Sequence, residues 1–473
     1  MSIWFDITTI LTWNRPAVGI VRVESECARH FRNATQSNTR FCCFDRSRGG
    51  YVEIDRNHVE EVLIRFKQGL AQQLSPVPEV AAGPAVSALS REERLKLGLL
   101  SLINRLPRRL RDAALRFAYT RREAFYGGLR AYQEARFALQ TLIGPNLSPS
   151  PPALVVPDPA PRPDRQALIF KSGDVYVSMG LDWDQKNLEY LYKLKQDIRL
   201  RVILFCYDII PVKLPHLCVG DVASRFAKYF TDVAWCADKI LCISDCSRRD
   251  LAQLLHEVGA PEPELSVVRL GSEVPRAPEQ LPSANVAEVL RHRYVLFVST
   301  IERRKNHETL YRAYCRLIDA GNIDIPLLVF VGMPGWGVHD LLSDLRLDPR
   351  IQPYIRMLNH VSDSDLAQLY RHAEFTVFPS LYEGWGLPVA ESLAYGKFCL
   401  ASNAASIAEF GGDLIEYLDP WDVPAWAERL GWYFRHPEEV AEREARIRLE
   451  YRAISWDETG AFVLAQANQL AIP

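Results

Sequence analysis

Short apolar runs alternate with longer amphipathic segments over much of the chain. Between residues 174 and 271 the runs are DVYVSMG, RVILFCYD, KILCIS and LSVVRLG, separated by helical-period segments such as NLEYLYKLKQDI and ASRFAKYFTDVAWCA. Strands that alternate with helices are typical of βαβ units, whose strands form a buried parallel sheet. A strand-like SIWFDIT and a helical VRVESECARHF near the N-terminus extend the series. We therefore predict a doubly wound, Rossmann-like α/β domain over residues 1–275.

A second alternating series begins at residue 293. Its apolar runs are RYVLFVST, IPLLVFVG, YIRMLNHV, EFTVFPS, FCLASN and LIEYLDP. This pattern predicts a second doubly wound domain over residues 290–455, joined to the first near residues 273–292. We expect residues 456–473 to form a helix that returns to the first domain. Ligands bind at the carboxyl ends of the strands in such sheets, so two facing domains predict an interdomain cleft.

Residues 60–165 interrupt the first series and form a predicted insert. Its run LGLLSLINRLPRRLRDAALRFAY has helical period, with arginines largely off the apolar face and a break or kink at Pro107. The apolar face is formed by Leu99, Ile103, Leu106, Leu110, Ala114 and Phe117. The proline-rich PNLSPSPPALVVPDPAPRPDR that follows is typical of an extended linker. The basic helix suits two roles: peripheral contact with an anionic lipid surface, or packing of its apolar face on the first domain.

Composition narrows the class of protein. The 473 residues are 48% hydrophobic and 24% charged with a formal net charge of −2, which is typical of a soluble globular protein and gives no nucleic-acid signature. The start MSIWFDITTILTWNRP lacks the basic and apolar regions of a signal peptide, and no stretch has the length and apolarity of a membrane span. Ten cysteines without a Cys-x-x-Cys pair favour reduced thiols. We therefore expect a cytoplasmic protein.

The stretch FPSLYEGWGLPVAES contains the first candidate site. Glu383 and Glu391 flank two glycines. The turn follows the strand-like EFTVF and precedes a predicted helix, and Pro388 suits the first position of that helix. Such a turn presents free N–H groups and the positive end of a helix dipole, which attract phosphate. Glu391, one turn into the helix, can accept two hydrogen bonds from a cis-diol such as ribose, and Glu383 can bind other hydroxyls. The alternative is that both glutamates only suit the helix N-terminus.

Two further elements follow strands of the second series. The cations of residues 303–305 lie directly before a helix that begins near Asn306, a good N-cap residue. Cations oppose the dipole at a helix N-terminus, so an anionic ligand explains them; the alternative is a solvated basic turn. The stretch SNAASIAEFGGD gives a weaker signal. Its small residues 404–406 fit close contact with a sugar or phosphate, while Glu409 needs no role beyond its helix.

Three stretches, FVSTIERRKN, FPSLYEGWGLPVAESLAYG and GGDLIEYLDP, together resemble the C-terminal domain of the retaining family-4 glycosyltransferases, which have the GT-B fold. The resemblance covers residues 290–435 and includes the Glu-x7-Glu element of that family, here Glu383 to Glu391. The first domain matches more loosely. VGIVRV resembles the glycine loop before the first helix, and YDIIP resembles a His-Asp-x-x-Pro element in which Tyr207 replaces the histidine.

The resemblance implies a site for a nucleotide-diphosphate sugar. It implies that Arg304 and Lys305 neutralise the diphosphate, that Glu391 binds the ribose, and that Gly19 closes over the diphosphate. The catalytic residues that it implies are Arg304, Lys305, Glu383 and Asp208. The donor-binding residues that it implies are Gly19, Gly384, Trp385, Gly386, Leu387 and Glu391.

The implied activity is a retaining hexosyltransferase. It would move a hexose, with mannose from GDP-mannose as the first candidate, to a saccharide or lipid-linked saccharide in cell-surface glycan synthesis such as O-antigen or exopolysaccharide. No metal or other cofactor is required, because cations and helix dipoles hold the diphosphate in this fold. Short Asp-x-Asp patterns such as DWD and DSD arise by chance, and the absence of Gly-x-Gly-x-x-Gly and P-loop motifs disfavours dehydrogenases and P-loop NTPases.

Other functions remain open at this point. Within the same fold, a phosphorylase or a sugar-nucleotide epimerase would use the same donor residues. From a different class, the chain would be an inactive sugar-nucleotide-binding scaffold subunit. If the basic insert binds lipid, we expect the protein at the inner face of the cytoplasmic membrane.

Overall fold

The computed structural model describes residues 1–13, 19–34, 38–67, 168–218, 220–273, 281–321, 324–335 and 337–471. The chain divides into two units, residues 1–71 with 167–473 and residues 72–166. The predicted basic helix and proline-rich linker lie outside the described residues. No helix among the described residues is long and apolar enough to cross a membrane.

The first sheet has seven strands in the order β3-β2-β1-β4-β5-β6-β7, parallel except for the antiparallel edge strand β3. Their bounds are β1 Ile3–Asp6, β2 Thr39–Asp45, β3 Gly50–Ile54, β4 Val175–Val177, β5 Arg201–Cys206, β6 Lys239–Cys242 and β7 Glu264–Val267. The accompanying helices are α1 Thr8–Thr12, α2 Ile20–Asn33, α3 Arg56–Lys67, α7 Asp182–Gln185, α8 Leu188–Ile198, α9 Ile210–Lys213, α10 Val222–Cys236 and α11 Asp245–Glu257.

Helices cover both faces of this sheet, whose central strands β1, β4 and β5 are buried and mostly apolar. Alternate side chains of a strand point to opposite faces. Ile203 of β5 lies in one core with residues of α2 and α3. Its neighbours Val202 and Leu204 lie in another core with residues of α8, α10 and α11. Buried continuous runs of this kind are what a doubly wound parallel sheet requires.

The second sheet has six strands, all parallel, in the order β10-β9-β8-β11-β12-β13. Their bounds are β8 Tyr294–Val298, β9 Leu327–Val331, β10 Ile355–Leu358, β11 Thr376–Phe378, β12 Cys399–Ser402 and β13 Glu416–Leu418. The helices are α12 Ala284–Val289, α13 His307–Asp319, α14 His339–Leu347, α15 Asp363–His372, α16 Leu387–Ala394, α17 Ala408–Gly411, α18 Val423–Arg435 and α19 Pro437–Glu450. The predicted class, α/β with two doubly wound Rossmann-like domains as in GT-B, is therefore confirmed.

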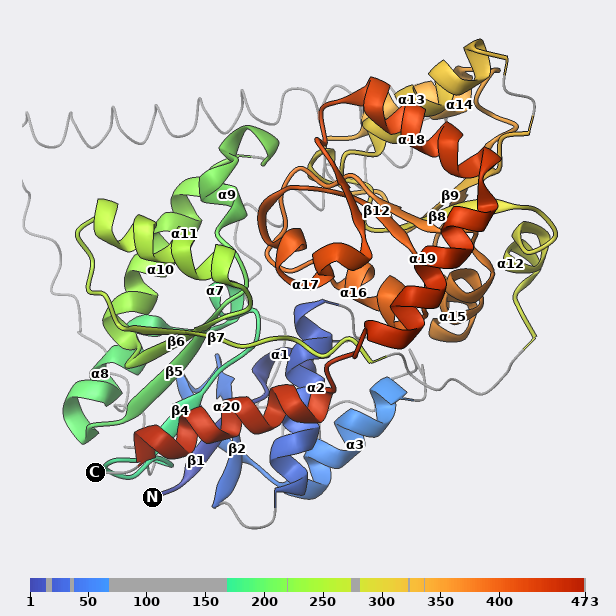
Figure 1. Ribbon diagram of the computed structural model, residues 1–473. Coiled ribbons are helices and arrows are strands. Elements are labelled where there is room, and N and C mark those ends of the chain that lie inside the picture. Colours follow the sequence, from blue (N-terminus) through green and yellow to red (C-terminus); the bar gives the residue numbers. More distant parts are fainter. Residues whose placement is uncertain are drawn as a thin grey trace, which may run out of the picture. The chain divides into compact units, whose positions relative to one another are not determined.

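The last helix, α20 (Trp456–Ala471), packs on the first sheet rather than the second (Figure 1). Trp456, Val463 and Leu464 are buried in the core that α2 shares with the first sheet. At Gly460 a side chain would meet Cβ of His30 at 2.5 Å, so α2 and α20 touch where the glycine stands. The chain therefore passes twice between the domains, once after β7 and once before α20.

The structure differs from the sequence-based expectation in two places. The strands β2 and β3 were not predicted, because the short run TRFCCFD stands apart from the regular βαβ series. Residues 60–67 belong to α3 and not to the insert, since Val59, Val62 and Leu63 pack in the first core.

Candidate functional site

Two cations and one carboxylate converge where β8 and β11 end. Nζ of Lys305 lies 2.7 Å from Oε1 of Glu383, and an NH1 atom of Arg304 lies 2.9 Å from the same oxygen. Arg304 also donates to the carbonyl oxygen of Tyr382 at 2.7 Å. Its own carbonyl oxygen accepts from the backbone N–H of Leu381 at 2.8 Å. The loop after β8 is thus joined to the turn before α16 by backbone and side-chain contacts.

This ion cluster is shielded from solvent. The side chains of Arg304, Lys305 and Glu383 are 20%, 13% and 8% exposed. Burial raises the pKa of Glu383, but the attraction of Arg304 and Lys305 outweighs it and lowers the pKa to about 2. Burial also lowers the pKa of Lys305, and Glu383 opposes that change. The cluster therefore holds fixed charges in a poorly hydrated place, where they act strongly on a bound anion.

The turn between β11 and α16 is held in shape from both sides. Gly386 has φ of 111°, a value that favours glycine, and directly precedes α16. The hydroxyl of Ser406 donates to the carbonyl oxygens of Glu383 and Trp385, both at 2.9 Å. The predicted small-residue element at 404–406 therefore supports the turn. Pro388 is the second residue of the helix, whose first residue is Leu387.

Gly384 brings this turn against the first domain. A side chain there would meet the carbonyl oxygen of Tyr207 at 2.5 Å and Cβ of Asp208 at 3.0 Å, so only glycine fits. The hydroxyl of Ser247, from α11, donates to the carbonyl oxygens of Tyr207 (3.0 Å) and Gly384 (3.3 Å). The loops that follow β5 and β11 thus meet, as their places at the carboxyl ends of the two sheets predict.

Tyr207 and Asp208 play different parts in this contact. The Tyr207 hydroxyl donates to the carbonyl oxygen of Met179 at 2.6 Å, inside the first domain, so this oxygen already has a partner. Asp208 accepts from the backbone N–H of Ile210 at 3.0 Å. Burial raises the pKa of Asp208, and Arg304 is the strongest influence that lowers it. Asp208 therefore belongs to the same electrostatic site as the cations.

Glu391 lies in a second polar contact between the domains. Its Oε1 is 3.1 Å from an NH1 atom of Arg22 on α2, and its Oε2 accepts from the Tyr370 hydroxyl at 3.2 Å. Gly19, with φ of 53°, directly precedes α2, one turn from Arg22. Residues 14–18 of the glycine loop lie outside the described residues.

The side chains of Trp385 and Asn306 make different contacts from those that their motifs predict. The Trp385 indole is 5% exposed and lies in the core of the first domain, so its side chain contributes packing. Asn306 is the N-cap residue of α13, as predicted, but its side chain makes no capping hydrogen bond to a backbone N–H group. It has left-handed backbone (φ 60°), and its Nδ2 donates to the carbonyl oxygens of Pro379 and Pro420. It thus fastens neighbouring loops, while its Oδ1 accepts from the Thr309 hydroxyl in the first turn of α13 at 3.0 Å.

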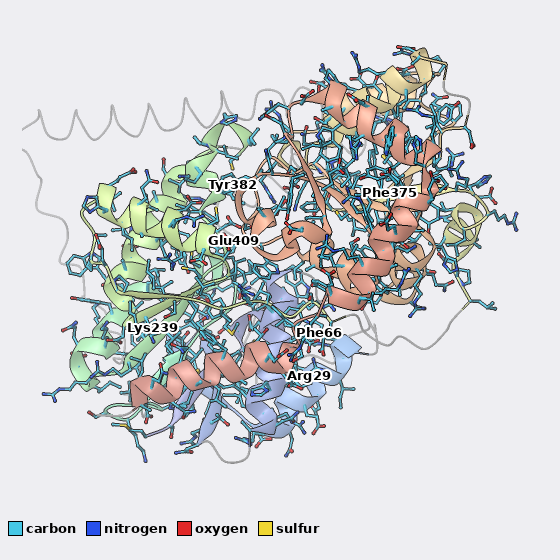
Figure 2. All side chains as sticks on the ribbon, in the orientation of Figure 1. Arg29, Phe66, Lys239, Phe375, Tyr382 and Glu409 are labelled. Carbon is cyan, nitrogen blue, oxygen red and sulfur yellow. The ribbon has the colours of Figure 1, made fainter. Side chains whose placement is uncertain are left out.

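Sequence reasoning missed two contacts that join the domains. The carboxylate of Glu409 accepts from the backbone N–H groups of Asp245 (2.8 Å) and Cys246 (2.7 Å) at the N-terminus of α11. The Tyr382 hydroxyl donates to the carboxylate of Asp250 on the same helix. Figure 2 shows Tyr382 and Glu409 on the side of their domain that carries these contacts. Both pairs join residues far apart in the sequence, so no local pattern predicts them.

A buried group of ionisable side chains in the first domain also went unpredicted. Nζ of Lys186 lies 2.5 Å from Asp182 and 3.3 Å from Asp6, and Asp6 accepts from the Tyr176 hydroxyl at 2.6 Å. Glu24 is fully buried nearby, and its Oε2 has no hydrogen-bond partner among the described residues. Burial raises the pKa of Glu24 to about 8. At neutral pH this carboxyl is therefore mostly protonated.

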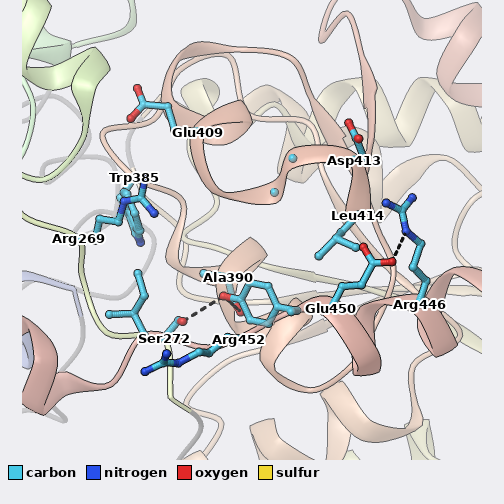
Figure 3. Close-up of a pocket in the computed structure, with 14 residues that line it drawn as sticks. Arg269, Ser272, Trp385, Ala390, Glu409, Asp413, Leu414, Arg446, Glu450 and Arg452 are labelled. Carbon is cyan, nitrogen blue, oxygen red and sulfur yellow. Dashed lines mark hydrogen bonds and ion pairs between the residues drawn. The ribbon is translucent and has the colours of Figure 1, made fainter.

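A pocket of about 380 Å³ lies behind the turn (Figure 3). Ser272 and Tyr451, which belong to the two chain crossings between the domains, share a hydrogen bond of 3.1 Å in its lining. Arg446 and Glu450 of α19 line it as an ion pair of 2.9 Å. Of the predicted site residues only Trp385 reaches this pocket. It is thus a separate cavity from the cation cluster.

Comparisons with known proteins find a match that includes the second domain. Residues 283–450 match the family model described as Glycosyl transferases group 1. The chain is 35% identical over 268 residues, 56% of its length, to O-antigen chain mannosyltransferase B of Escherichia coli. It is 28% identical over 198 residues, 39% of its length, to serotype-specific mannosyltransferase WbdA of Escherichia coli. The matches span 66% of the first relative and 24% of the second.

Solved structures also resemble the chain. The crystal structure of Anabaena Alr3699/HepE in complex with UDP is 13% identical, with a TM-score of 0.49, and the match covers 63% of this chain and 79% of that one.

Proposed function

We propose that the chain is a retaining hexosyltransferase, on the basis of the match of residues 283–450 to the family model Glycosyl transferases group 1. It takes its donor as a nucleotide-diphosphate sugar and transfers the hexose to a saccharide acceptor. The observation that carries the proposal is the convergence of Arg304 and Lys305 on Glu383 at the glycine turn. This cluster places fixed cations beside the N-terminus of α16.

The cations suit the leaving group of this reaction. When the bond between the anomeric carbon and the diphosphate oxygen breaks, negative charge develops on the diphosphate. Preorganised charges in a poorly hydrated site stabilise such charge without reorganisation during the reaction. Arg304 and Lys305 are held in place by Glu383 and by the carbonyl oxygen of Tyr382. They are therefore already positioned before the donor arrives.

The two glutamates suit the hydroxyl groups of the donor. Glu391, beside the start of α16, would bind the ribose, and Glu383 would accept hydrogen bonds from sugar hydroxyls while it orients the cations. Backbone N–H groups from Gly384 to Leu387 would bind phosphate at the N-terminus of α16. Gly19, at the start of α2, would close over the diphosphate from the first domain.

Retention of the anomeric configuration is consistent with a front-face reaction. In that case a leaving phosphate oxygen accepts the proton of the acceptor hydroxyl, so no dedicated base is needed, and the transition state has oxocarbenium character. Asp208 lies on the first-domain side of the site and interacts electrostatically with Arg304. Its place is suited to stabilise positive charge at the sugar. No metal is required, because cations and helix dipole hold the diphosphate.

The relatives guide the choice of sugar. Both relatives described above are named as mannosyltransferases, and one of them is named as an O-antigen chain enzyme. We therefore take GDP-mannose as the first donor to test, and a saccharide or lipid-linked saccharide of a cell-surface glycan as the acceptor. A cytoplasmic site of action follows, since nucleotide sugars are the donors.

The test is a transfer assay with the full chain and a panel of GDP-, UDP- and dTDP-hexoses. We expect one donor to release its nucleoside diphosphate when a mannose-containing oligosaccharide is present, with the hexose added to that acceptor with retained anomeric configuration. Loss of nucleoside diphosphate release in Lys305→Ala would assign the reaction to the site that contains Lys305. Failure of every donor to bind or react would overturn the proposal.

A further inference from the structure

Arg22 links the Glu391 carboxylate to both chain crossings between the domains. Its NH1 lies 3.1 Å from Oε1 of Glu391, and its NH2 donates to the carbonyl oxygen of Glu273 at 3.5 Å. Its guanidinium carbon lies 5.7 Å from the centre of the Trp456 ring. Glu273 belongs to the first crossing and Trp456 to the second. Arg22 therefore reaches the second domain's site from a helix of the first domain.

The Glu391 carboxylate has hydrogen-bond acceptor positions left for a diol. An ionised carboxylate has about four acceptor positions. Arg22 contacts one oxygen and the Tyr370 hydroxyl the other, which leaves one acceptor position on each. A ribose 2′,3′-diol needs two acceptors side by side, and a charged acceptor makes the stronger hydrogen bonds. The ion pair thus need not break when a ribose binds.

Arg22 also favours the charged form of this carboxyl. Burial raises the pKa of Glu391, and Arg22 is the strongest influence that lowers it. Of the other groups that act on it, the Tyr370 hydroxyl lowers the pKa and Asp363, also on α15, raises it. Tyr395, after α16, stacks on the Tyr370 ring with centres 4.9 Å apart. Arg22 is thus the cation that acts against burial, although burial outweighs it and the pKa of Glu391 stays raised.

We propose that Arg22 is a positioning residue for ribose recognition, which holds Glu391 in the orientation that accepts both ribose hydroxyls. This inference rests on the proposed function, because it takes Glu391 as the ribose site. Because Arg22 comes from the first domain, recognition of the ribose depends on the contact between the domains. The Arg22 guanidinium itself touches no part of the ribose.

The test compares ribose and dideoxyribose nucleotides. The probes are GDP and 2′,3′-dideoxy-GDP, with the UDP pair in parallel, titrated into wild-type protein and Arg22→Gln between pH 5.5 and 9. The readout is the ratio of the two Kd values, which isolates the hydroxyl contribution from changes at the phosphates. Arg32→Gln, on the same helix but paired with Glu60, is the matched control.

We expect the ratio to fall about tenfold in Arg22→Gln at pH 7, since Glu391 loses the guanidinium that fixes its Oε1 and with it the orientation that accepts both hydroxyls. The loss should be smaller at higher pH, because removal of Arg22 raises the pKa of Glu391 further and a higher pH favours the charged form. Arg32→Gln should match the wild type, and Arg22→Lys, which keeps the charge, should lie between. If Arg22→Gln does not fold, Arg22→Lys decides.

Two results would overturn different claims. A ratio equal to the wild-type value at every pH, in each Arg22 variant that folds, would refute the role of Arg22 while leaving the proposed function intact. Absence of GDP and UDP binding to the wild-type protein would refute the proposed function, and the inference with it.

Discussion

Lys305 and Glu383 form an ion pair of 2.7 Å between the loop after β8 and the turn after β11. These two residues are 78 positions apart, and the parallel order of the strands brings them together. The pair is poorly exposed, so its charges are little screened. The site is therefore built as a charged framework before any ligand is present.

Replacing Lys305 removes one of two cations at the site. We expect Lys305→Ala to lower kcat of hexose transfer by about two orders of magnitude, as the loss of one charge-stabilising donor does in other sites. Arg312→Ala, which breaks an exposed ion pair with Glu308, is the control and should leave kcat unchanged. Equal activity of the two variants would remove the electrostatic role of Lys305.

Glu383 makes the free energy of unfolding depend on pH. Its pKa is lowered to about 2, so its ion pairs stabilise the folded chain above the unfolded pKa near 4.5 and are lost as the pH falls toward 2. We expect Glu383→Gln to lower the free energy of unfolding by about 3 kcal/mol at pH 7, since it leaves buried cations unpaired. Urea denaturation should show this difference shrinking below pH 4.5, and a constant difference would contradict the account.

The contribution of Glu24 to the free energy of unfolding should change with pH in the opposite direction. Its pKa is raised to about 8, so the folded chain holds a proton that the unfolded chain loses above pH 4.5. The stability tied to this group is present below pH 4.5 and falls as the pH rises to 8. We expect Glu24→Gln to gain stability relative to wild type between pH 5 and 8.5, measured by urea denaturation. Glu60→Gln, a half-exposed carboxylate, should show no such trend.

The sequence predicts most of this fold because its strands are continuous apolar runs. Lys305, Glu383 and Glu391 were identified from the glycine turn and from a resemblance, and the structure brings Lys305 and Glu383 together. The partners Arg22 and Glu409 were not predicted, since each pairs with a residue more than 150 positions away. Glu24 gave no signal, because its helix reads as an ordinary amphipathic one. Such contacts depend on how the two sheets meet.

A substitution at Gly384 tests whether the loops after β5 and β11 are in contact. A methyl group there would lie 2.5 Å from the carbonyl oxygen of Tyr207, which is backbone and cannot turn aside. We expect Gly384→Ala to lower the free energy of unfolding by about 1–3 kcal/mol and to weaken nucleotide binding, because the turn must move away from Asp208. Thermal unfolding with and without GDP checks both effects. An unchanged Tm and affinity would show that the two loops do not touch.

We propose that Arg304 and Lys305 hold the diphosphate of a nucleotide-linked donor, and a calorimetric comparison of GDP with GMP and of UDP with UMP examines this role. We predict that the wild-type protein binds one of the diphosphates about tenfold or more tightly than its monophosphate, since the second phosphate gains charge-assisted hydrogen bonds. Lys305→Ala should remove most of that difference. Equal affinity for diphosphate and monophosphate in the wild-type protein, or no binding of either, would contradict the account.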